Sequence, residues 1–503
     1  MNSVDQLKQS VIVAYASIIF SILAGLFYTP WMISQIGRDD FGLYSLVSVF
    51  ISYFLIDFGI GQVISTYVAK NRASKDFDSL RRIVGVCYKF FFLLTILISL
   101  TLFAIYFFID DIFASLSPDQ GHKFKVIYII AGFFSVVCFP LMPLNGIITA
   151  FEKFVVLKVL DFVQKLLSVS LIIICLLNGW GLYALVAVNG LVGFGIGLYK
   201  LAYTKRNLHI SLEAHAKLDK SLVRELMSFS GWVFIMGLAQ RFIIGSGPTI
   251  LGMVSGASAI AVFSIAMTLE GYIWMFSNAV NGLFIPKVAQ YIEDGATPRQ
   301  LTDRMITVGR LQLLIIGTIV GGLIALGASF INLWVGPQFR LSYITALLLI
   351  SPQLILVTQE IANTLLWVKN LVKYRCISYL TGTVLNVGLG LLLSKFFGVV
   401  GCGIGVFCSL TLICIILNII YIKKLHLSME SFFYNCHLKI LPLLSIPVAL
   451  IIGAQTWLVI DNWYKWLGMA VLFCAMEFVM AFLALSHDEK KLLLPVFFNK
   501  FEL

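Results

Sequence analysis

Long apolar runs limit what this chain can fold into. A helix needs about 20 mostly apolar residues to cross the hydrocarbon core of a bilayer, and fourteen such runs, separated by short polar breaks, occupy more than half of the 503 residues. Hydrophobic residues make up 60% of the chain and charged residues 12%. The sequence therefore predicts an all-α integral membrane protein, and the continuous rather than alternating runs exclude a membrane β-barrel.

The predicted spans follow one another with only short loops between them. They cover residues 11–35, 43–66, 84–108, 126–150, 155–177, 182–199, 229–251, 259–284, 311–330, 343–366, 377–395, 401–421, 440–460 and 467–485. Prolines at 30, 140, 143, 248 and 352 lie within spans, where each removes a backbone hydrogen bond and permits a kink.

The net charge of +11 predicts how the chain is oriented in the membrane and does not indicate binding to nucleic acid. With a cytoplasmic N-terminus, most of the 36 Lys and Arg residues fall in cytoplasmic segments, in agreement with the positive-inside rule. An even number of spans returns the C-terminus to the same side. We therefore expect a multi-pass protein with both termini in the cytoplasm and no bound nucleic acid.

A weak internal repeat appears at a shift of about 220 residues. Tyr44-Ser45 matches Phe263-Ser264, Val68-Ala69 matches Val288-Ala289, and Gly181 matches Gly401. Six spans per repeat predict two six-helix bundles of equal orientation, related by a pseudo-two-fold axis along the membrane normal, as in alternating-access transporters. The expected divisions are residues 1–225 for the first bundle with its following loop, 226–425 for the second bundle, and 426–503 for two additional C-terminal spans and a tail.

Several ionisable residues lie at bilayer depth, where each costs at least about 2.5 kcal/mol unless it is paired or hydrated. Arg241 and Glu270 fall near the middle of their spans. A guanidinium keeps its proton and binds phosphate through two hydrogen bonds, which makes Arg241 the preferred anchor for an anionic substrate. The remaining candidates are Lys89, Lys158 and Lys165 for substrate binding, and Asp57, Asp161, Glu270 and Glu360 for ion coupling or ion pairing.

Each candidate also has a purely structural interpretation. Lys89 and Lys158 can extend to the cytoplasmic interface. Arg241 and Glu270 can pair and lock two helices, and Lys165 can neutralise Asp161 on the same helical face. So many buried charges in one membrane protein favour a hydrated cleft between the two bundles.

Motifs for covalent chemistry, metal binding or nucleotide use are missing from the sequence. The outer loops are short, and the nine cysteines form no C-x-x-C pair. We therefore expect a secondary transporter rather than an enzyme, without a cofactor, and driven either by a coupling ion such as H⁺ or Na⁺ or by the substrate gradient itself.

Three segments resemble a known family. Pro30 to Leu46 reads PWMISQIGRDDFGLYSL, Asp57 to Gly61 reads DFGIG, and Leu333 to Phe339 reads LWVGPQF. These segments are similar to the oligosaccharide-flippase and polysaccharide-transport branch of the multidrug, oligosaccharidyl-lipid and polysaccharide exporter superfamily. Relatives often carry an acidic residue in the outer half of helix seven, where this chain reads Gly245 to Pro248.

The resemblance implies a flippase that moves a polyprenyl-pyrophosphate-linked oligosaccharide, such as an O-antigen or capsule repeat unit, to the outer leaflet of a bacterial inner membrane. It implies membrane lipid and other polysaccharide-assembly proteins as partners. A cation-coupled multidrug exporter of the same superfamily is the alternative, although twelve spans suffice for such a pump. A membrane-embedded polysaccharide polymerase or ligase is the remote alternative, because it needs a substantial outer loop.

Overall fold

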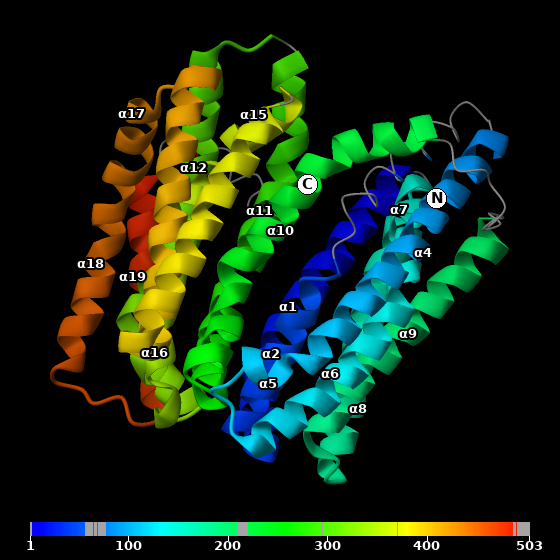
Figure 1. The fold of residues 1–503 in the computed structure, drawn as a ribbon. Coiled ribbons are helices and arrows are strands. Elements are labelled where there is room, and N and C mark those ends of the chain that lie inside the picture. The colour runs from blue at the N-terminus through cyan, green and yellow to red at the C-terminus, as the bar shows by residue number, and fades with distance from the viewer. Residues whose placement is uncertain are drawn as a thin grey trace. The chain divides into compact units, whose positions relative to one another are not determined.

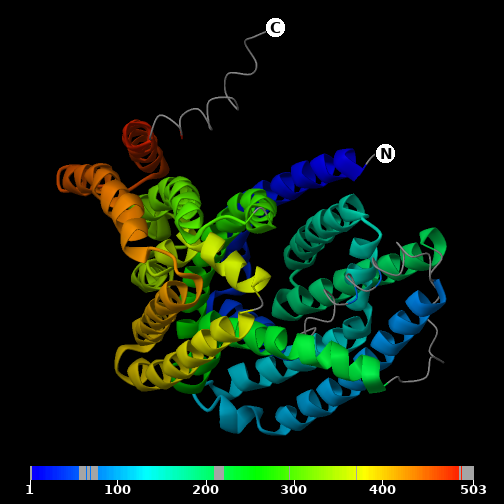
Figure 2. The same cartoon turned by 90° about the horizontal axis from the view of Figure 1, so that it is seen from above.

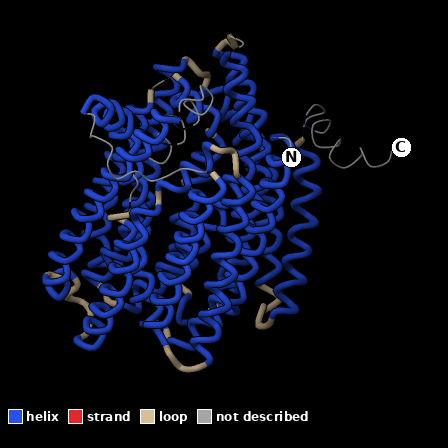
Figure 3. The backbone as a smooth tube through the Cα atoms, turned by 90° about the vertical axis from the view of Figure 1, so that its right-hand side faces the viewer, coloured by secondary structure: helices blue, strands red, loops and turns tan. Residues whose placement is uncertain are grey.

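Helices are the only regular elements in the part of the chain that the structure describes. This computed structural model describes residues 3–55, 64, 68, 77–208, 220–293, 295–369, 371–485 and 489, and no strand occurs among them (Figure 3). Inside a bilayer a helix satisfies its own backbone N–H and C=O groups. The all-α prediction is therefore confirmed.

The described residues divide into two compact units, one formed by residues 1–264 and 383–402 and the other by 265–382 and 403–503. The helices before the middle of the chain are blue to green in Figure 1. They are α1 (Ser3–Ile36), α2 (Arg38–Ser52), α4 (Phe77–Phe107), α5 (Ile109–Ile112), α6 (Pro118–Cys138), η1 (Phe139–Leu141), α7 (Pro143–Ala150), α8 (Phe154–Leu177), α9 (Gly181–Asn207) and α10 (Lys220–Val254).

The later helices run from green to red in the same view. They are α11 (Ala257–Glu293), α12 (Pro298–Trp334), η2 (Pro337–Phe339), α13 (Leu341–Ile350), α14 (Gln353–Thr358), α15 (Glu360–Val368), α16 (Val372–Leu425), α17 (Met429–Phe432), η3 (Phe433–Leu438), α18 (Lys439–Gln455) and α19 (Trp463–Ala484). The domain boundaries predicted at residues 225 and 425 stay a prediction.

The number of membrane spans agrees with the sequence. Within the described ranges, twelve helical stretches are long and apolar enough to cross a membrane. One of them, α16, contains two predicted spans, because Gly398 interrupts its helical backbone. The predicted span at 43–66 begins in α2 and continues into residues outside the described ranges. About fourteen spans are therefore confirmed, and the chain is a multi-pass membrane protein.

The prolines shape the helices in different ways. Pro140 lies in a short 3₁₀ turn between α6 and α7, which divides the span predicted at 126–150. Pro30 and Pro248 lie inside continuous helices. Near Pro248, Asn386 Nδ2 donates hydrogen bonds to the Ile243 carbonyl at 2.6 Å and to the Ser246 hydroxyl at 2.8 Å. These bonds satisfy polar groups close to the proline, where the regular helical pattern is weakened.

Within the second unit, α18 and α19, orange and red in Figure 2, pack against α12. All three helices contribute side chains to one buried apolar cluster. Phe473 approaches α12 closely because Gly321 and Gly322 lack side chains there; a Cβ at Gly322 would lie 3.2 Å from the Phe473 ring. Small residues at helix interfaces are typical of membrane proteins, since lipid tails compete with apolar side chains and close packing must hold the helices together.

Arg310 of α12 connects this helix to η3 and to the end of α19. Its Nε donates to Glu489 Oε1 at 2.6 Å, its Nη1 to the Asn435 carbonyl at 2.9 Å, and its Nη2 to the Ala484 carbonyl at 2.5 Å. Glu489 is only 4% exposed. The guanidinium therefore neutralises a buried carboxylate and ties the end of α19 to α12 and η3.

The chain reversal in α16 gives a test of the fold. Gly398 has φ of 54°, which favours glycine, and a Cβ at Gly401 would overlap the backbone of Leu393. We expect Gly401→Ala to destabilise the protein by roughly 1–3 kcal/mol through overpacking. A Cβ added at Gly388 of the same helix would meet nothing within 4 Å, so Gly388→Ala is the matched control. Thermal unfolding in detergent checks this, and equal melting temperatures of the two variants contradict it.

Candidate functional site

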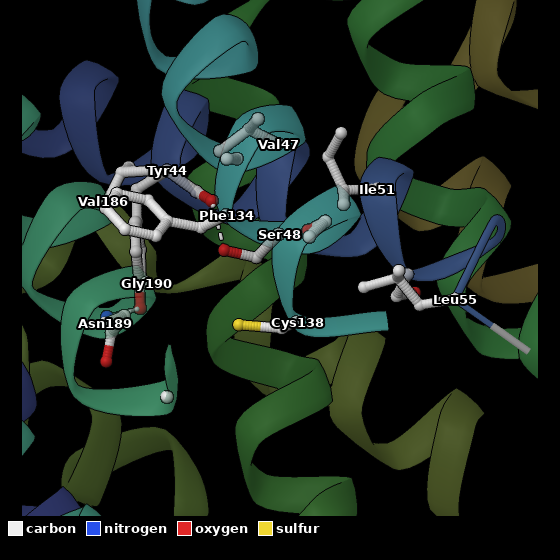
Figure 4. Close-up of a pocket in the computed structure, with 14 residues that line it drawn as sticks. Tyr44, Val47, Ser48, Ile51, Leu55, Phe134, Cys138, Val186, Asn189 and Gly190 are labelled. Carbon is white, nitrogen blue, oxygen red and sulfur yellow. Dashed lines mark hydrogen bonds between the residues drawn. The ribbon is translucent and has the colours of Figure 1, made fainter. Parts of the chain in front are cut away.

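A cavity of about 270 Å³ lies inside the first unit, between α2, α6 and α9 (Figure 4). Its described lining combines hydroxyl, amide and thiol groups with apolar side chains, and none of these lining residues carries a formal charge. The volume is close to the lower end of the ~300–1,000 Å³ range of small-molecule pockets. The cavity therefore suits one small polar group rather than a whole oligosaccharide.

Helical periodicity brings the lining side chains together. Residues spaced by three, four and seven positions share one face of a helix. Tyr44, Ser48 and Ile51 follow this spacing on α2, and Ala131, Phe134 and Cys138 follow it on α6. Val186, Asn189 and Gly193 follow it on α9. Three faces thus converge because α2, α6 and α9 all pack against one another.

Hydrogen bonds fix the polar groups of the cavity. Asn189 Nδ2 donates to the Tyr44 hydroxyl at 3.0 Å and to the Leu185 carbonyl at 3.0 Å. The Ser48 hydroxyl donates to the Tyr44 carbonyl at 2.8 Å, and the Ser52 hydroxyl donates to the Val49 carbonyl at 2.6 Å. A hydroxyl that donates one bond keeps acceptor lone pairs. Ser48 and Ser52 therefore offer acceptor oxygens.

Gly190 allows an aromatic ring to form one wall of the cavity. A Cβ at position 190 would overlap the Phe134 ring, so only glycine permits the observed approach of α6 and α9 at this point. Phe134 is half-buried and lines the cavity. The wall thus presents an aromatic surface opposite hydroxyl and amide groups.

Arg241 lies next to this cavity. Its Nη1 donates to the carbonyl oxygen of Ser52 at 2.6 Å, and Ser52 is a lining residue. Arg241 is exposed although it lies in a membrane-spanning segment of α10. A permanently charged group and an uncharged cavity with a few hydroxyl and amide groups are therefore neighbours within one unit.

The position of Arg241 depends on close packing between α10 and α2. Phe242 stacks on Tyr53 with ring centroids 4.4 Å apart. The hydroxyl groups of Tyr53 and Thr249 form a hydrogen bond of 3.2 Å. A Cβ at Gly245 would lie 3.1 Å from Val49. The absence of a side chain at Gly245 therefore allows α10 to pack closely against α2.

The predicted cationic residues of α4 and α8 have separate environments. Lys158 is exposed, whereas Lys89 and Lys165 are half-buried. Asp161 has its ion-pair partner on α9, where Lys200 Nζ lies 3.8 Å from its Oδ1. Lys200 is 8% exposed and also donates to Asn145 Oδ1 at 3.0 Å. The structure thus pairs Asp161 with Lys200 rather than with Lys165.

The predicted acidic residues of the second unit are both hydrogen-bonded. Glu270 of α11 is 7% exposed and accepts a hydrogen bond from the Gln353 amide. Glu360 is half-buried, accepts from Asn363 Nδ2 at 3.2 Å, and is attracted by the Arg375 charge. Asp57 lies outside the described residues. Within the described ranges, no group of three or more His, Cys, Asp or Glu could hold a metal ion.

Arg241 and Glu270 belong to different units and have different partners, the Ser52 carbonyl and the Gln353 amide. The pairing of Arg241 with Glu270 stays a prediction.

Sequence reasoning missed two buried cations, Lys200 and Arg375. The predicted spans end at 199 and begin at 377, which places both residues in loops. In the structure α9 extends to Asn207 and α16 begins at Val372. Arg375 is 7% exposed, with its Cζ 5.6 Å from the centroid of the Tyr379 ring. Tyr379 lies four positions after Arg375, and residues at this spacing share a face of a helix. This spacing was the sequence signal that could have indicated a helix through Arg375.

Comparisons with known proteins give both family and fold. A family model described as polysaccharide biosynthesis protein matches residues 7–292. A search of curated proteins found no match. The structure is similar to lipid II flippase MurJ in an inward closed conformation, with a TM-score of 0.73 and 12% identity over 97% of this chain and 99% of that one.

Two multidrug transporter structures are also similar. An inward-facing multidrug resistance MATE family transporter of the MOP superfamily gives a TM-score of 0.63 with 14% identity, covering 84% of this chain and 99% of that one. A eukaryotic MATE transporter gives 0.57 with 15% identity, covering 86% and 98%. At these identities the likeness establishes the fold.

The buried Arg375 charge gives a testable prediction. We expect Glu360→Gln alone and Arg375→Met alone each to lower stability by about 1.5–3 kcal/mol, because each removes the opposite charge that attracts the charged group left behind. The double variant should lose less than the sum of the two, since the two sites interact. Thermal unfolding in detergent measures this, with the exposed Glu430→Gln as control. Additive losses contradict an interaction between Glu360 and Arg375.

Proposed function

The chain belongs to the polysaccharide biosynthesis protein family, and from this premise we propose that it is a flippase for a lipid-linked oligosaccharide. The substrate is a polyprenyl-pyrophosphate-linked repeat unit of O-antigen, capsule or a related polymer. It moves from the cytoplasmic to the outer leaflet of a bacterial inner membrane by alternating access, with both termini of the protein in the cytoplasm.

One observation carries this proposal, the exposed Arg241 guanidinium in a membrane-spanning helix beside an uncharged cavity that offers hydroxyl and amide groups. An arginine at this depth is costly unless water or a counter-charge reaches it. A pyrophosphate supplies such a counter-charge, and guanidinium groups bind phosphate oxygens through two parallel hydrogen bonds. An exposed guanidinium in a membrane-spanning helix therefore suits a substrate that carries a pyrophosphate.

The fold alone does not distinguish a flippase from a multidrug exporter, because structures of both kinds are similar to this chain. Multidrug pumps for cationic compounds need acidic and aromatic binding surfaces, and a guanidinium repels a cation. The family match and Arg241 both favour an anionic substrate. A drug-susceptibility panel in a host without its own pumps tests the alternative; resistance conferred by this chain would support it.

Glu270 is our proposed site of cation coupling, with H⁺ or Na⁺ as the ion. Its carboxyl is almost fully buried in a membrane-spanning segment and has an amide partner, Gln353, that donates to it. A buried carboxyl changes its charge when it gains or loses a cation, and desolvation makes that change sensitive to its surroundings. Ion release on one side of the membrane then favours one orientation of the transporter.

Arg241 provides the central test of the flippase. In a strain that lacks the gene, we expect lipid-linked repeat units to accumulate and the surface polymer to disappear. Arg241→Ala should fail to restore the polymer, with a loss of at least about tenfold, whereas Arg241→Lys keeps the charge and restores part of it. Arg206→Ala, an exposed arginine at the end of α9, is the control at equal protein level. Normal polymer with Arg241→Ala removes the residue from the mechanism, and normal polymer in the strain itself refutes the function.

Glu270→Gln tests coupling without removing the hydrogen bond, because the Gln amide oxygen can still accept from Gln353. With purified protein in vesicles that contain lipid-linked oligosaccharide, we expect an imposed H⁺ or Na⁺ gradient to accelerate transport by the wild type. The gradient should have no effect on Glu270→Gln, while the exposed Glu430→Gln control behaves as the wild type. A full response of the Glu270→Gln protein would contradict coupling at this site.

A further inference from the structure

We propose that the cavity between α2, α6 and α9 binds one uncharged sugar ring of the substrate. This inference rests on the proposed function and adds a substrate class to it. It states that the sugar next to the pyrophosphate is a neutral pyranose. Two neighbouring features carry it: an uncharged cavity whose mostly apolar lining includes several hydroxyl and amide groups, and the Arg241 guanidinium, which donates to the carbonyl oxygen of the lining residue Ser52.

The chemistry of the lining selects a neutral polyol. A sugar ring presents many hydroxyl groups that both donate and accept, together with one less polar face of C–H groups. Ser48, Ser52, Ser135 and Asn189 supply polar groups of the same kind. Phe134 supplies an aromatic wall on which the less polar face of the ring can rest.

Charge argues against an acidic or basic sugar in this cavity. The described lining residues carry no formal charge, and a charged group moved from water into such a site needs a paired charge. The Arg241 guanidinium donates to the Ser52 carbonyl but does not belong to the lining. A substrate with its phosphate at Arg241 and its first sugar in the cavity matches this division of charge.

Size agrees with a single ring. A volume of about 270 Å³ equals the share of roughly nine water molecules at ~30 Å³ each. Such a cavity holds one six-membered ring with its hydroxyl groups, and leaves the rest of an oligosaccharide outside it. Recognition of one ring next to the pyrophosphate allows the remaining sugars to vary.

Cys138 makes the cavity testable, because its thiol is half-buried and belongs to the lining. Full-length protein in detergent is treated with N-ethylmaleimide, and alkylation of each cysteine is followed by peptide mass spectrometry. The probes are methyl α-glucopyranoside, methyl N-acetyl-β-glucosaminide and, as the charged comparison, methyl glucuronide. Cys408 is also half-buried but lies outside the cavity, so it is the internal reference.

We expect at least one neutral glycoside to slow alkylation of Cys138 several-fold and to leave Cys408 unchanged, with no protection by the glucuronide. Protection by none of the neutral probes, equal protection by the glucuronide, or no alkylation of Cys138 in the absence of sugar each overturns the proposal.

Two variants of α9 form a matched pair. Alanine at 190 would push the Phe134 ring, whereas alanine at 195 meets nothing within 4 Å. We expect Gly190→Ala to abolish sugar protection and Gly195→Ala to retain it. Asn189→Leu is the second variant, which should weaken protection about tenfold through loss of polar contacts even if Gly190→Ala folds poorly. Full protection in the Asn189→Leu protein contradicts a role for the amide.

The two proposals fail separately. If no glycoside protects Cys138 and the chain still restores the surface polymer, the flippase proposal is supported and the sugar-site proposal is contradicted. If a neutral glycoside protects Cys138 but the strain without the gene makes normal polymer, the sugar-site proposal is supported and the flippase proposal is contradicted.

Discussion

Polar groups inside a bilayer have no bulk water to bind, and this constraint governs both the fold and the site. Backbone groups meet it by forming helices throughout the described ranges. Side chains meet it by finding partners on other helices, as Lys200 does with Asn145 and Asp161, and as Glu270 does with Gln353. Arg241 differs from these residues because it is exposed as well as bonded to a carbonyl. Its charge is therefore accessible to a ligand, whereas the charge of Lys200 is enclosed.

Glycine has two distinct uses in this chain. At Gly398 it allows a backbone conformation with positive φ, which divides two spans within α16. At Gly190 it removes a side chain from a contact between α9 and the Phe134 ring. The first use sets the course of the chain, and the second sets the shape of the cavity. A side chain at Gly195, only five residues from Gly190, would meet nothing, so glycine content alone does not reveal which position matters.

Much of the fold could be predicted because span length and composition are local properties. The runs near 155–177 and 467–485 agree closely with α8 and α19. Helix ends were harder, since α9 and α16 carry charged residues beyond the apolar runs. The apolar runs consequently leave Lys200 and Arg375 in loops, although both are buried. The Asp161 partner was missed for the same reason: spacing within α8 favours Lys165, but tertiary packing supplies Lys200 from α9.

The cavity could not be predicted for a different physical reason. Charged residues in an apolar run are conspicuous, so Arg241 and Glu270 could be identified from the sequence. Serine and asparagine are common in membrane helices, where they bond backbone carbonyls, as Ser48 and Asn189 both do. Their additional role depends on three helices that bring uncharged groups together. In the flippase that we propose, the charge of Arg241 and the uncharged lining of the adjacent cavity would divide recognition between the phosphate and one sugar, so that the sugars farther along the substrate could vary.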